Sequence, residues 1–441
     1  MLRNMLGPDT KTSSITAAQK LTTKDPGVKG RMWVSRVRVE TEGRGEESRE
    51  VVMQAVKEMG DEGENWEEPL GKVLEAEWTG YRAGISDNAP ESTDLSEKQK
   101  FDNLMDETTS KVTALYFHGG AMYLLDPATY RPMAARLARQ TGGRVFNVRY
   151  RLAPQNPFPA ALLDAFTAYL TLLYPPPGSP HASVPANEIV FAGDSAGGMI
   201  CAALLQLLLQ LHRSHADEPS LPTTAWYGNT VQIPLPAGLA LSSPWLDVTR
   251  SLPSIEANTH YDYIPPPSLM NKMKYPPCPA WPAKPPRPEL YCDTSVMLHP
   301  LVSPLLAKDW SGAPPVFFSL GEEMLRDEDA VLARRLHAQG VKVRWREFEA
   351  MPHVFGIILD GTKASDLHFE ETAGFCKDAV EGTVGQSDAT FVLLKGLERR
   401  VVAMEDLTGI EDEEVEKALR EGKKRIEMRH GDAVAEMKPM L

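Results

Sequence analysis

Short apolar runs that alternate with helical patterns constrain the fold of this chain most strongly. Residues 112–117 form a nearly continuous apolar run, as expected of a strand that is buried on both faces. Comparable runs follow at 144–148, 188–192, 239–243, 316–320 and 341–348, the last strand expected. Helical patterns occur between several of them, at 130–141, 160–173 and 197–211. Such βαβ units predict an α/β fold with a mostly parallel central sheet flanked by helices.

Three regions follow from this pattern. Residues 1–110 should hold an N-terminal leader, cap elements and the first strands, with strands at 31–40 and 73–81 and a polar surface connection at 85–110. Residues 111–385 should form the α/β core that holds this sheet. Within them, 246–310 is dense in proline, which removes backbone donors and excludes regular sheet. We expect this insertion to form part of a cap, and residues 386–441 to form a C-terminal helical tail.

Composition narrows the class of protein. The chain has 60 acidic and 47 basic residues and a net charge of −13, which argues against a nucleic-acid partner. Its four cysteines are too few and too scattered for a disulfide framework or a zinc site, so we expect a reducing, cytoplasmic location. No apolar stretch reaches the ~20 residues that span a bilayer. We therefore expect no stable membrane insertion.

The sharpest chemical signal is the run from Gly193 to Gly197, which reads Gly-Asp-Ser-Ala-Gly and lies between a strand and an apolar helix. A nucleophilic serine in this setting sits on a tight turn whose neighbours must be small. The start of the helix then lies beneath the reacting oxygen, where the helix dipole favours negative charge. This predicts Ser195 as a nucleophile.

A second signal is His118-Gly119-Gly120, directly after the strand at 112–117. Acyl transfer forms a tetrahedral oxyanion that needs backbone N–H donors, and glycines allow close approach to it. We expect the N–H groups of Gly119, Gly120 and Ala196 to form the oxyanion hole. We expect His118 to hold the loop and not to transfer protons.

A serine nucleophile needs a histidine base and an acid that orients this base. Where the serine sits on such a strand-to-helix turn of an α/β sheet, the acid comes next along the chain and the histidine last. His353 occupies a turn just after the strand at 341–348, so it is the expected base; His337 and His368 lack that position. The acid should stand immediately after the strand at 316–320, which favours Glu323. Asp327, one helical turn further on, is the alternative acid.

Together these motifs resemble the hormone-sensitive lipase family of α/β-hydrolases, which includes arylacetamide deacetylases and steryl acetyl hydrolase-like carboxylesterases. The resemblance covers about residues 110–376 and rests on five blocks: His118-Gly119-Gly120, 150–154 with 158–161, 193–198, Leu325-Arg326-Asp327-Glu328 and His353. It implies that Glu323 is the triad acid. It also implies supporting roles for Asp164, near the nucleophile, and for Asp194, under the oxyanion loop. One departure is Ala121, where the family has a third glycine.

These observations predict a serine carboxylic-ester hydrolase that acts through an acyl-enzyme on a small to medium acyl ester, without metal or cofactor. Two alternatives use the same scaffold: a non-catalytic small-molecule receptor, and an amide or lactone hydrolase. The expected partner is a small-molecule ester, and a homodimer is left open.

Overall fold

The protein is described here as a computed structural model covering residues 13–40, 46–270 and 275–437 of the 441-residue chain. The start of the expected N-terminal leader, residues 1–12, lies outside the described residues.

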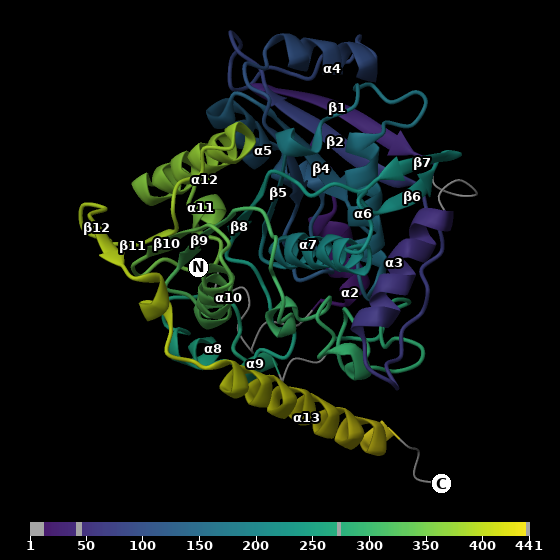
Figure 1. The fold of residues 1–441 in the computed structure, drawn as a ribbon, viewed down its shortest axis with the longest axis vertical. Helices are drawn as coiled ribbons and strands as arrows, with labels where there is room; N and C mark the ends of the chain where they lie inside the picture. Colours follow the sequence, from purple (N-terminus) through teal and green to yellow (C-terminus); the bar gives the residue numbers. More distant parts are fainter. Residues whose placement is uncertain (1–12, 41–45, 271–274, 438–441) are drawn as a thin grey trace.

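A ten-stranded sheet, in the order β1-β2-β4-β3-β5-β8-β9-β10-β11-β12, forms the centre of the molecule (Figure 1). Neighbouring strands from β4 to β11 pair in parallel, whereas β2 and β12 run antiparallel to their neighbours. This confirms the predicted mostly parallel sheet. The strands are β1 Met32–Val39, β2 Leu74–Tyr81, β3 Thr113–Phe117, β4 Arg144–Arg149, β5 Ile189–Asp194, β8 Gly238–Ser242, β9 Val316–Gly321, β10 Val343–Phe348, β11 Asp388–Val392 and β12 Arg399–Val402; β6 Thr223–Trp226 and β7 Asn229–Gln232 form a separate pair.

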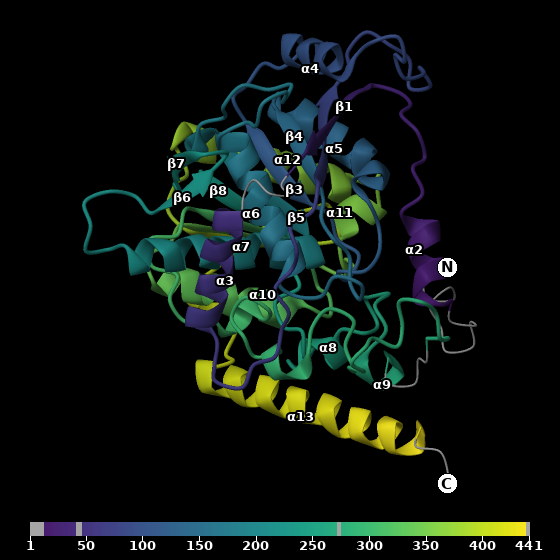
Figure 2. The same ribbon diagram turned by 90° about the vertical axis from the view of Figure 1, so that its right-hand side faces the viewer.

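Helices cover both faces of this sheet. Because side chains alternate along each strand, each buried strand presents apolar residues to both helix layers. Leu115 and Phe117 of β3 face one layer, and Tyr116 faces the other. The first layer holds α3 Glu46–Met59, α6 Ala160–Leu173, α7 Ala196–Ser214 and α10 Arg326–Ala338; the second holds α5 Pro127–Thr141 and α12 Lys363–Glu381 with the short α11 Phe355–Ile358 (Figures 1 and 2). Among the described residues, α7 alone is long and apolar enough to cross a membrane, and 78% of that stretch is buried in the molecule.

The segment 85–110, predicted to be a surface connection, contains a helix. Helix α4, Glu97–Asp106, begins with a capping box between Ser96 and Gln99. Phe101 and Leu104 are spaced by one turn and are buried, and the helix packs on β1 and β2. The prediction was wrong because this apolar face is narrow and lies among charged residues.

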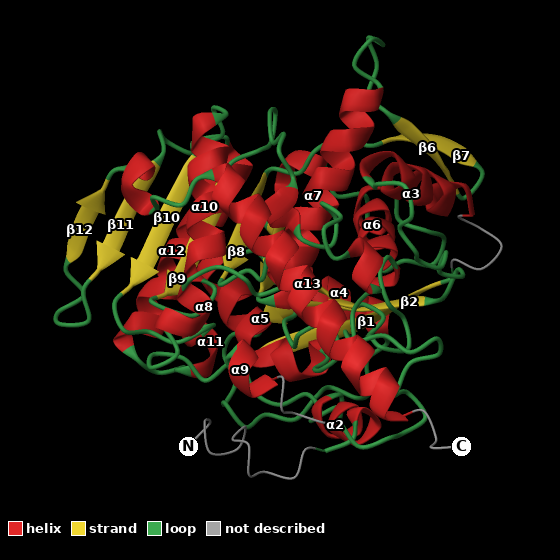
Figure 3. Cartoon of the chain, turned by 90° about the horizontal axis from the view of Figure 1, so that it is seen from below, coloured by secondary structure: helices red, strands yellow, loops and turns green. Residues whose placement is uncertain are grey.

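The expectation of a helical tail over 386–441 also needs correction. The tail begins with β11 and β12, which extend the sheet beyond β10, so the strand expected last is followed by two more. Only α13, Asp412–Met437, is a long helix there. It crosses one end of the molecule, next to the insertion (Figure 3). The sequence pattern of these two short strands is weak because exposed charged residues surround them.

The described part of the proline-rich insertion, residues 246–270 and 275–310, contains no strand of the central sheet, as predicted. It has only short helical pieces, with α8 Ser254–Ala257 and α9 Pro267–Met270 as its α-helices; residues 271–274 of the insertion lie outside the described part. The N-terminal helix α2, Ile15–Thr22, is tied to the core by Gln19, whose Nε2 donates to the carbonyl oxygen of Ala153 at 2.9 Å.

Candidate active site

The expected site residues follow the carboxyl ends of parallel strands. Ser195 directly follows β5, Glu323 follows β9 and His353 follows β10, while His118 and Gly119 follow β3. Because β3, β5, β9 and β10 point the same way, these loops meet at one edge of the sheet. Chain segments far apart in sequence are thereby brought together.

Ser195 occupies a strained turn between β5 and α7. Its backbone angles are φ 51° and ψ −120°, a conformation that L-residues rarely adopt. The turn is held by backbone hydrogen bonds from Ser195 N to the Ser242 carbonyl and from Trp245 N to the Ser195 carbonyl, both 3.0 Å. Within the otherwise buried turn 193–197, Ser195 alone is partly exposed. The fold therefore presents this one hydroxyl at the sheet edge.

The glycines around Ser195 are required by close packing. A Cβ on Gly197 would collide with the carbonyl oxygen of Phe117, and one on Gly193 would lie 2.6 Å from the backbone of Gly197. The strand and the helix that flank the serine thus touch the end of β3 directly. This close packing is the predicted reason why the residues beside Ser195 must be small.

Glu323 and His353 are brought into contact. Oε2 of Glu323 lies 3.3 Å from Nδ1 of His353, and the two side chains are almost completely buried. Asp327 faces a different partner: its Oδ2 accepts a hydrogen bond from Ser254 N at 2.8 Å, so it ties α8 to the start of α10. Of the two candidate acids, Glu323 is the one at the base.

Ser243 is a site residue that the sequence analysis missed. Its Oγ donates to Oε2 of Glu323 at 3.0 Å and accepts from Val354 N, next to His353, at 3.1 Å. It follows β8, between the loops of the nucleophile and the acid. The only sequence signal was its place at the end of a predicted strand.

The charges around His353 favour its protonated form. Burial alone would lower the pKa of His353, but the carboxylates of Glu323, Asp262 and Asp194 outweigh it, so that the pKa lies above its usual value. Burial raises the pKa of Glu323, and the adjacent His353 opposes that shift. An imidazolium formed at His353 is therefore stabilised by its surroundings.

The oxyanion loop differs from expectation at two residues, Gly119 and Ala121. The N–H of Gly119 points to Oδ1 of Asp194 and to the Tyr130 hydroxyl, each at 3.2 Å, so it is occupied. Within the described residues, the N–H groups of Gly120, Ala121 and Ala196 have no hydrogen-bond partner. Gly120 and Ala121 also reach solvent. In this structure the N–H of Gly119 is therefore bonded within the protein, whereas that of Ala121, which was not expected as a donor, is free within the described part of the chain.

Asp194 and His118 hold this loop in place. Asp194 accepts hydrogen bonds from the hydroxyl groups of Tyr116 at 2.7 Å and Tyr130 at 2.9 Å. The His118 ring stacks on Tyr150 at a centroid distance of 4.4 Å, and its Nδ1 lies 2.7 Å from the Gly119 carbonyl oxygen. Burial lowers the pKa of His118 to about 4, so the ring is neutral and Nδ1–H donates.

Asp164 acts at a greater remove than the resemblance implied. It lies on α6, and its carboxylate pairs with Arg151, accepting from Arg151 N at 2.7 Å and from the guanidinium at 2.8 Å. The contact fixes the loop after β4, which carries Tyr150. Asp164 therefore reaches the oxyanion loop through that tyrosine and not through Ser195.

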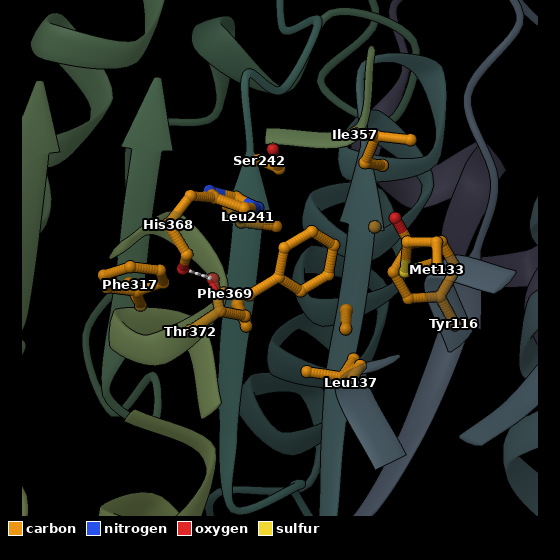
Figure 4. Close-up of a pocket in the computed structure, with 13 residues that line it drawn as sticks. Tyr116, Met133, Leu137, Leu241, Ser242, Phe317, Ile357, His368, Phe369 and Thr372 are labelled. Atoms are coloured by element: carbon orange, nitrogen blue, oxygen red, sulfur yellow. Dashed lines mark hydrogen bonds between the residues drawn. The ribbon is translucent and has the colours of Figure 1, made fainter. Parts of the chain in front are cut away.

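A small apolar cavity lies behind the site, between the sheet and the layer of α5 and α12 (Figure 4). Tyr116, Phe317 and Phe369 line it together with Gly193 and His368. Nδ1 of His368 lies 2.7 Å from the Ser319 hydroxyl, and burial lowers the pKa of His368 to about 3. This histidine, expected in a charged segment, is a neutral core residue.

Comparison with known proteins shows the family of the chain. The profile of the α/β-hydrolase fold family matches residues 114–357, more than half of the chain. The chain belongs to this family. The match includes the loops of Ser195, Glu323 and His353. The relatives below include an arylacetamide deacetylase-like protein, in agreement with the predicted hormone-sensitive lipase branch.

Curated relatives each match more than half of the chain. An acetyl-hydrolase of Streptomyces hygroscopicus is 29% identical over 260 residues, which cover 58% of this chain and 73% of that protein. The carboxylesterase NlhH of Mycobacterium tuberculosis is 30% identical over 240 residues, covering 54% and 65%. Human arylacetamide deacetylase-like 3 is 26% identical, covering 59% and 69%. The matches to the two bacterial proteins thus span about two thirds to three quarters of their length.

Solved structures confirm the fold. An esterase from the bacterial hormone-sensitive lipase family aligns with a TM-score of 0.55 at 21% identity, covering 86% of this chain and 95% of that one. An esterase/lipase from an uncultured bacterium aligns with a TM-score of 0.53 at 20% identity, covering 86% and 96%. The fold of this chain is accordingly that of these two esterase structures.

Proposed function

We propose that this protein is a serine carboxylic-ester hydrolase. The observation that carries the proposal is the contact between Glu323 and His353 at the sheet edge where the strained turn presents Ser195. A serine hydroxyl is a weak nucleophile until a base takes its proton, and that base needs a carboxylate to orient it. The esterase and acetyl-hydrolase names of the relatives support the same reaction.

In this mechanism Ser195 attacks the ester carbonyl carbon while His353 takes the hydroxyl proton. His353 returns that proton to the departing alcohol, and an acyl-enzyme remains on Ser195. Water, activated by the same histidine, then releases the acid. Glu323 stabilises the imidazolium in each step, consistent with the direction of the pKa shift at His353.

The oxyanion of each tetrahedral intermediate is assigned to the N–H groups of Gly120, Ala121 and Ala196. Their lack of partners in the described structure supports this donor set, and Asp194 keeps Gly119 back from it. Loss of one such donor typically costs about 100- to 1000-fold in rate. The positive φ of Gly120 and Ala121 turns the loop at this point.

The proline-rich insertion and α2 are assigned as a cap that selects the substrate. Tyr263 of the insertion lies with its ring centroid 6.2 Å from that of His353, and Tyr275 reaches the hydroxyl of Tyr123 beside the oxyanion loop at 3.2 Å. Aromatic walls this close to the base suit a small to medium acyl ester. Amide or lactone cleavage would use the same groups, but no contact favours it.

The test is hydrolysis of p-nitrophenyl esters from acetate to palmitate. Ser195→Ala and His353→Ala should each lose at least about 1000-fold in kcat, because removing nucleophile or base leaves only binding and the oxyanion hole. A fluorophosphonate probe should label the wild type and not Ser195→Ala. The chain length of the best ester measures the acyl pocket.

Matched controls separate chemistry from folding. Ser214→Ala, at the far end of α7, and His337→Ala, on the surface beside Glu405, should keep wild-type rates. A wild type no faster than Ser195→Ala on every ester, and not labelled by the probe, would favour the receptor alternative. A homodimer and a cytoplasmic location stay predictions from the sequence.

A further inference from the structure

One buried carboxylate near the base has no role in the mechanism above. Asp262 belongs to the proline-rich insertion, between α8 and α9, and is only 4% exposed. Burying a carboxylate is costly unless hydrogen bonds compensate it. The hydrogen-bond partners of Asp262 therefore indicate which parts of the structure this buried carboxylate holds together.

Asp262 binds the loops of the acid and of the base at the same time. Its Oδ2 accepts a hydrogen bond from Met324 N at 3.0 Å, immediately after Glu323. Its Oδ1 accepts from His353 N at 3.3 Å. The same Oδ1 accepts from Tyr263 N at 2.7 Å, which fixes the carboxylate within its own turn. One side chain thus spans two loops that follow different strands.

Other contacts from the insertion support the same alignment. Nδ2 of Asn258 donates to the carbonyl oxygen of Glu323 at 2.9 Å, and Oγ of Ser254 donates to that of Met324 at 2.8 Å. The acid loop is therefore held against the insertion from three positions. Among the hydrogen bonds that the described part of the insertion makes with the acid loop, those of Asp262 extend to the base loop through His353 N.

The charge of Asp262 also bears on the base. The charged groups that face His353 are Glu323 from the loop after β9, Asp194 from the end of β5, and Asp262 from the insertion; the Tyr263 ring packs beside them. All three carboxylates raise the pKa of His353. Removal of one of them should lower that pKa.

We propose that Asp262 is a positioning residue, which aligns His353 with Glu323 and makes this alignment depend on the seating of the insertion. The inference rests on the proposed function. It means that the insertion does more than shape the substrate pocket: displacing it would remove the Asp262 bridge between the acid and base loops and leave the bridge that Ser243 makes among the described residues. A misplacement of about 1 Å at reacting groups can cost roughly 100-fold in rate.

The test compares Asp262→Asn with the wild type in the full-length protein. The amide keeps the size but places an NH2 group against a backbone N–H and removes the charge. We expect kcat on the best p-nitrophenyl ester to fall at least about tenfold with KM within about threefold. The acidic limb of the kcat/KM profile should move to lower pH, because the pKa of His353 falls.

Asp247→Asn is the matched control. Asp247 is a completely buried carboxylate of the same insertion whose oxygens accept from Thr249 N and Ser251 N, both at 2.8 Å, and it touches neither acid nor base loop. It should lower the melting temperature comparably while the pH profile stays unchanged. Equal losses of kcat in both variants, with neither profile shifted, would overturn the proposal.

Asp262→Glu covers the case in which Asp262→Asn does not fold. It keeps the charge but displaces the carboxylate by one methylene, so the acidic limb should stay in place while kcat falls. Wild-type kcat in this variant would overturn the positioning role. NMR titration of 13C-labelled histidine, with the His353 signal assigned from His353→Gln, gives a readout without turnover. If the wild type hydrolyses no ester, the proposed function fails, while an unshifted His353 titration in Asp262→Asn would separately refute this inference.

Discussion

The Glu323 carboxylate receives contacts from two other chain segments. Ser243 donates to its Oε2, His353 lies against the same oxygen, and Asn258 holds its backbone carbonyl. Asp327, only one turn away on α10, instead accepts a hydrogen bond from the backbone N–H of Ser254. Position relative to the strand end, more than residue type, distinguishes these two acids.

Substituting each acid separates their roles. Glu323→Gln should lower kcat/KM by about 1000-fold or more, since the base loses its orienting charge. Its residual activity should have an acidic limb at lower pH, because the carboxylate that raised the pKa of His353 is gone. Profiles of kcat/KM between pH 5 and 9 measure both the loss of rate and the position of the acidic limb.

Asp327→Asn is the comparison for Glu323→Gln. It should keep an acidic limb like that of the wild type and lose mainly stability, through the weakened bond to Ser254. If Asp327→Asn shows the larger loss of kcat and the shifted limb, the assignment of the two acids must be exchanged.

At the scale of elements, α13 fastens the insertion to the rest of the molecule. Val415 and Leu419 are completely buried, and Nζ of Lys423 reaches the Ser295 carbonyl oxygen at 3.4 Å. A Cβ on Gly422 would lie 2.7 Å from Oγ1 of Thr249, so the helix and the insertion meet at a glycine. Figures 1 and 2 show α13 beneath α8 and α9.

Gly422→Ala should therefore destabilise the protein despite the better helix propensity of alanine. The added methyl group meets a threonine hydroxyl that is already bonded to Asp247, and such overpacking costs about 1–3 kcal/mol. Gly374→Ala, in α12 with open space around it, should gain up to about 1 kcal/mol. Denaturant unfolding of both variants decides; equal stabilisation would mean that α13 does not press on the insertion.

At the scale of the whole molecule, a buried carboxyl group couples stability to pH. Asp329 on α10 is fully buried, and neither oxygen has a hydrogen-bond partner within the described residues. Burial, reinforced by the neighbouring Glu328 and Glu323, raises its pKa well above the usual range. The folded state therefore retains a proton that the unfolded chain releases above its own, lower pKa.

The direction in which stability changes with pH follows from this difference in pKa between the folded and unfolded states. For a group with a raised folded-state pKa, stability is present at low pH and is lost as pH rises toward that pKa. Asp329→Ala removes the group and should raise the free energy of unfolding by about 1–3 kcal/mol at pH 8, and by less at pH 5. Denaturant unfolding at both pH values measures it. A variant that is less stable at pH 8 would show that Asp329 has a stabilising partner.

Much of this architecture follows from local patterns. The apolar runs predict β3, β4, β5, β8, β9 and β10, because strands buried on both faces must be apolar throughout. Ser195 and His353 could be singled out as candidates because the turn after such a strand needs particular small residues and has a predictable position. Family membership follows from the same blocks and is confirmed by the profile match.

Elements stabilised mainly by tertiary contacts could not be predicted in this way. Helix α4 and strands β11 and β12 carry charges on their exposed sides, so their periodicity is weak, and pairing or packing with the sheet determines them. The hydrogen bond from Gly119 N to Asp194 could not be predicted, because only the folded chain brings that carboxylate to the N–H. Ser243 and Asp262 act through loops remote in sequence.

The sequence by itself therefore determined the strand and helix order, the family and the residues whose chemistry depends on a local turn. The tertiary structure decided which carboxylate meets His353, which N–H groups stay without a partner, and how the insertion joins the acid and base loops. The physical reason is that turns and buried strands depend on neighbours along the chain. Hydrogen bonds between loops depend on distances that only the completed fold sets.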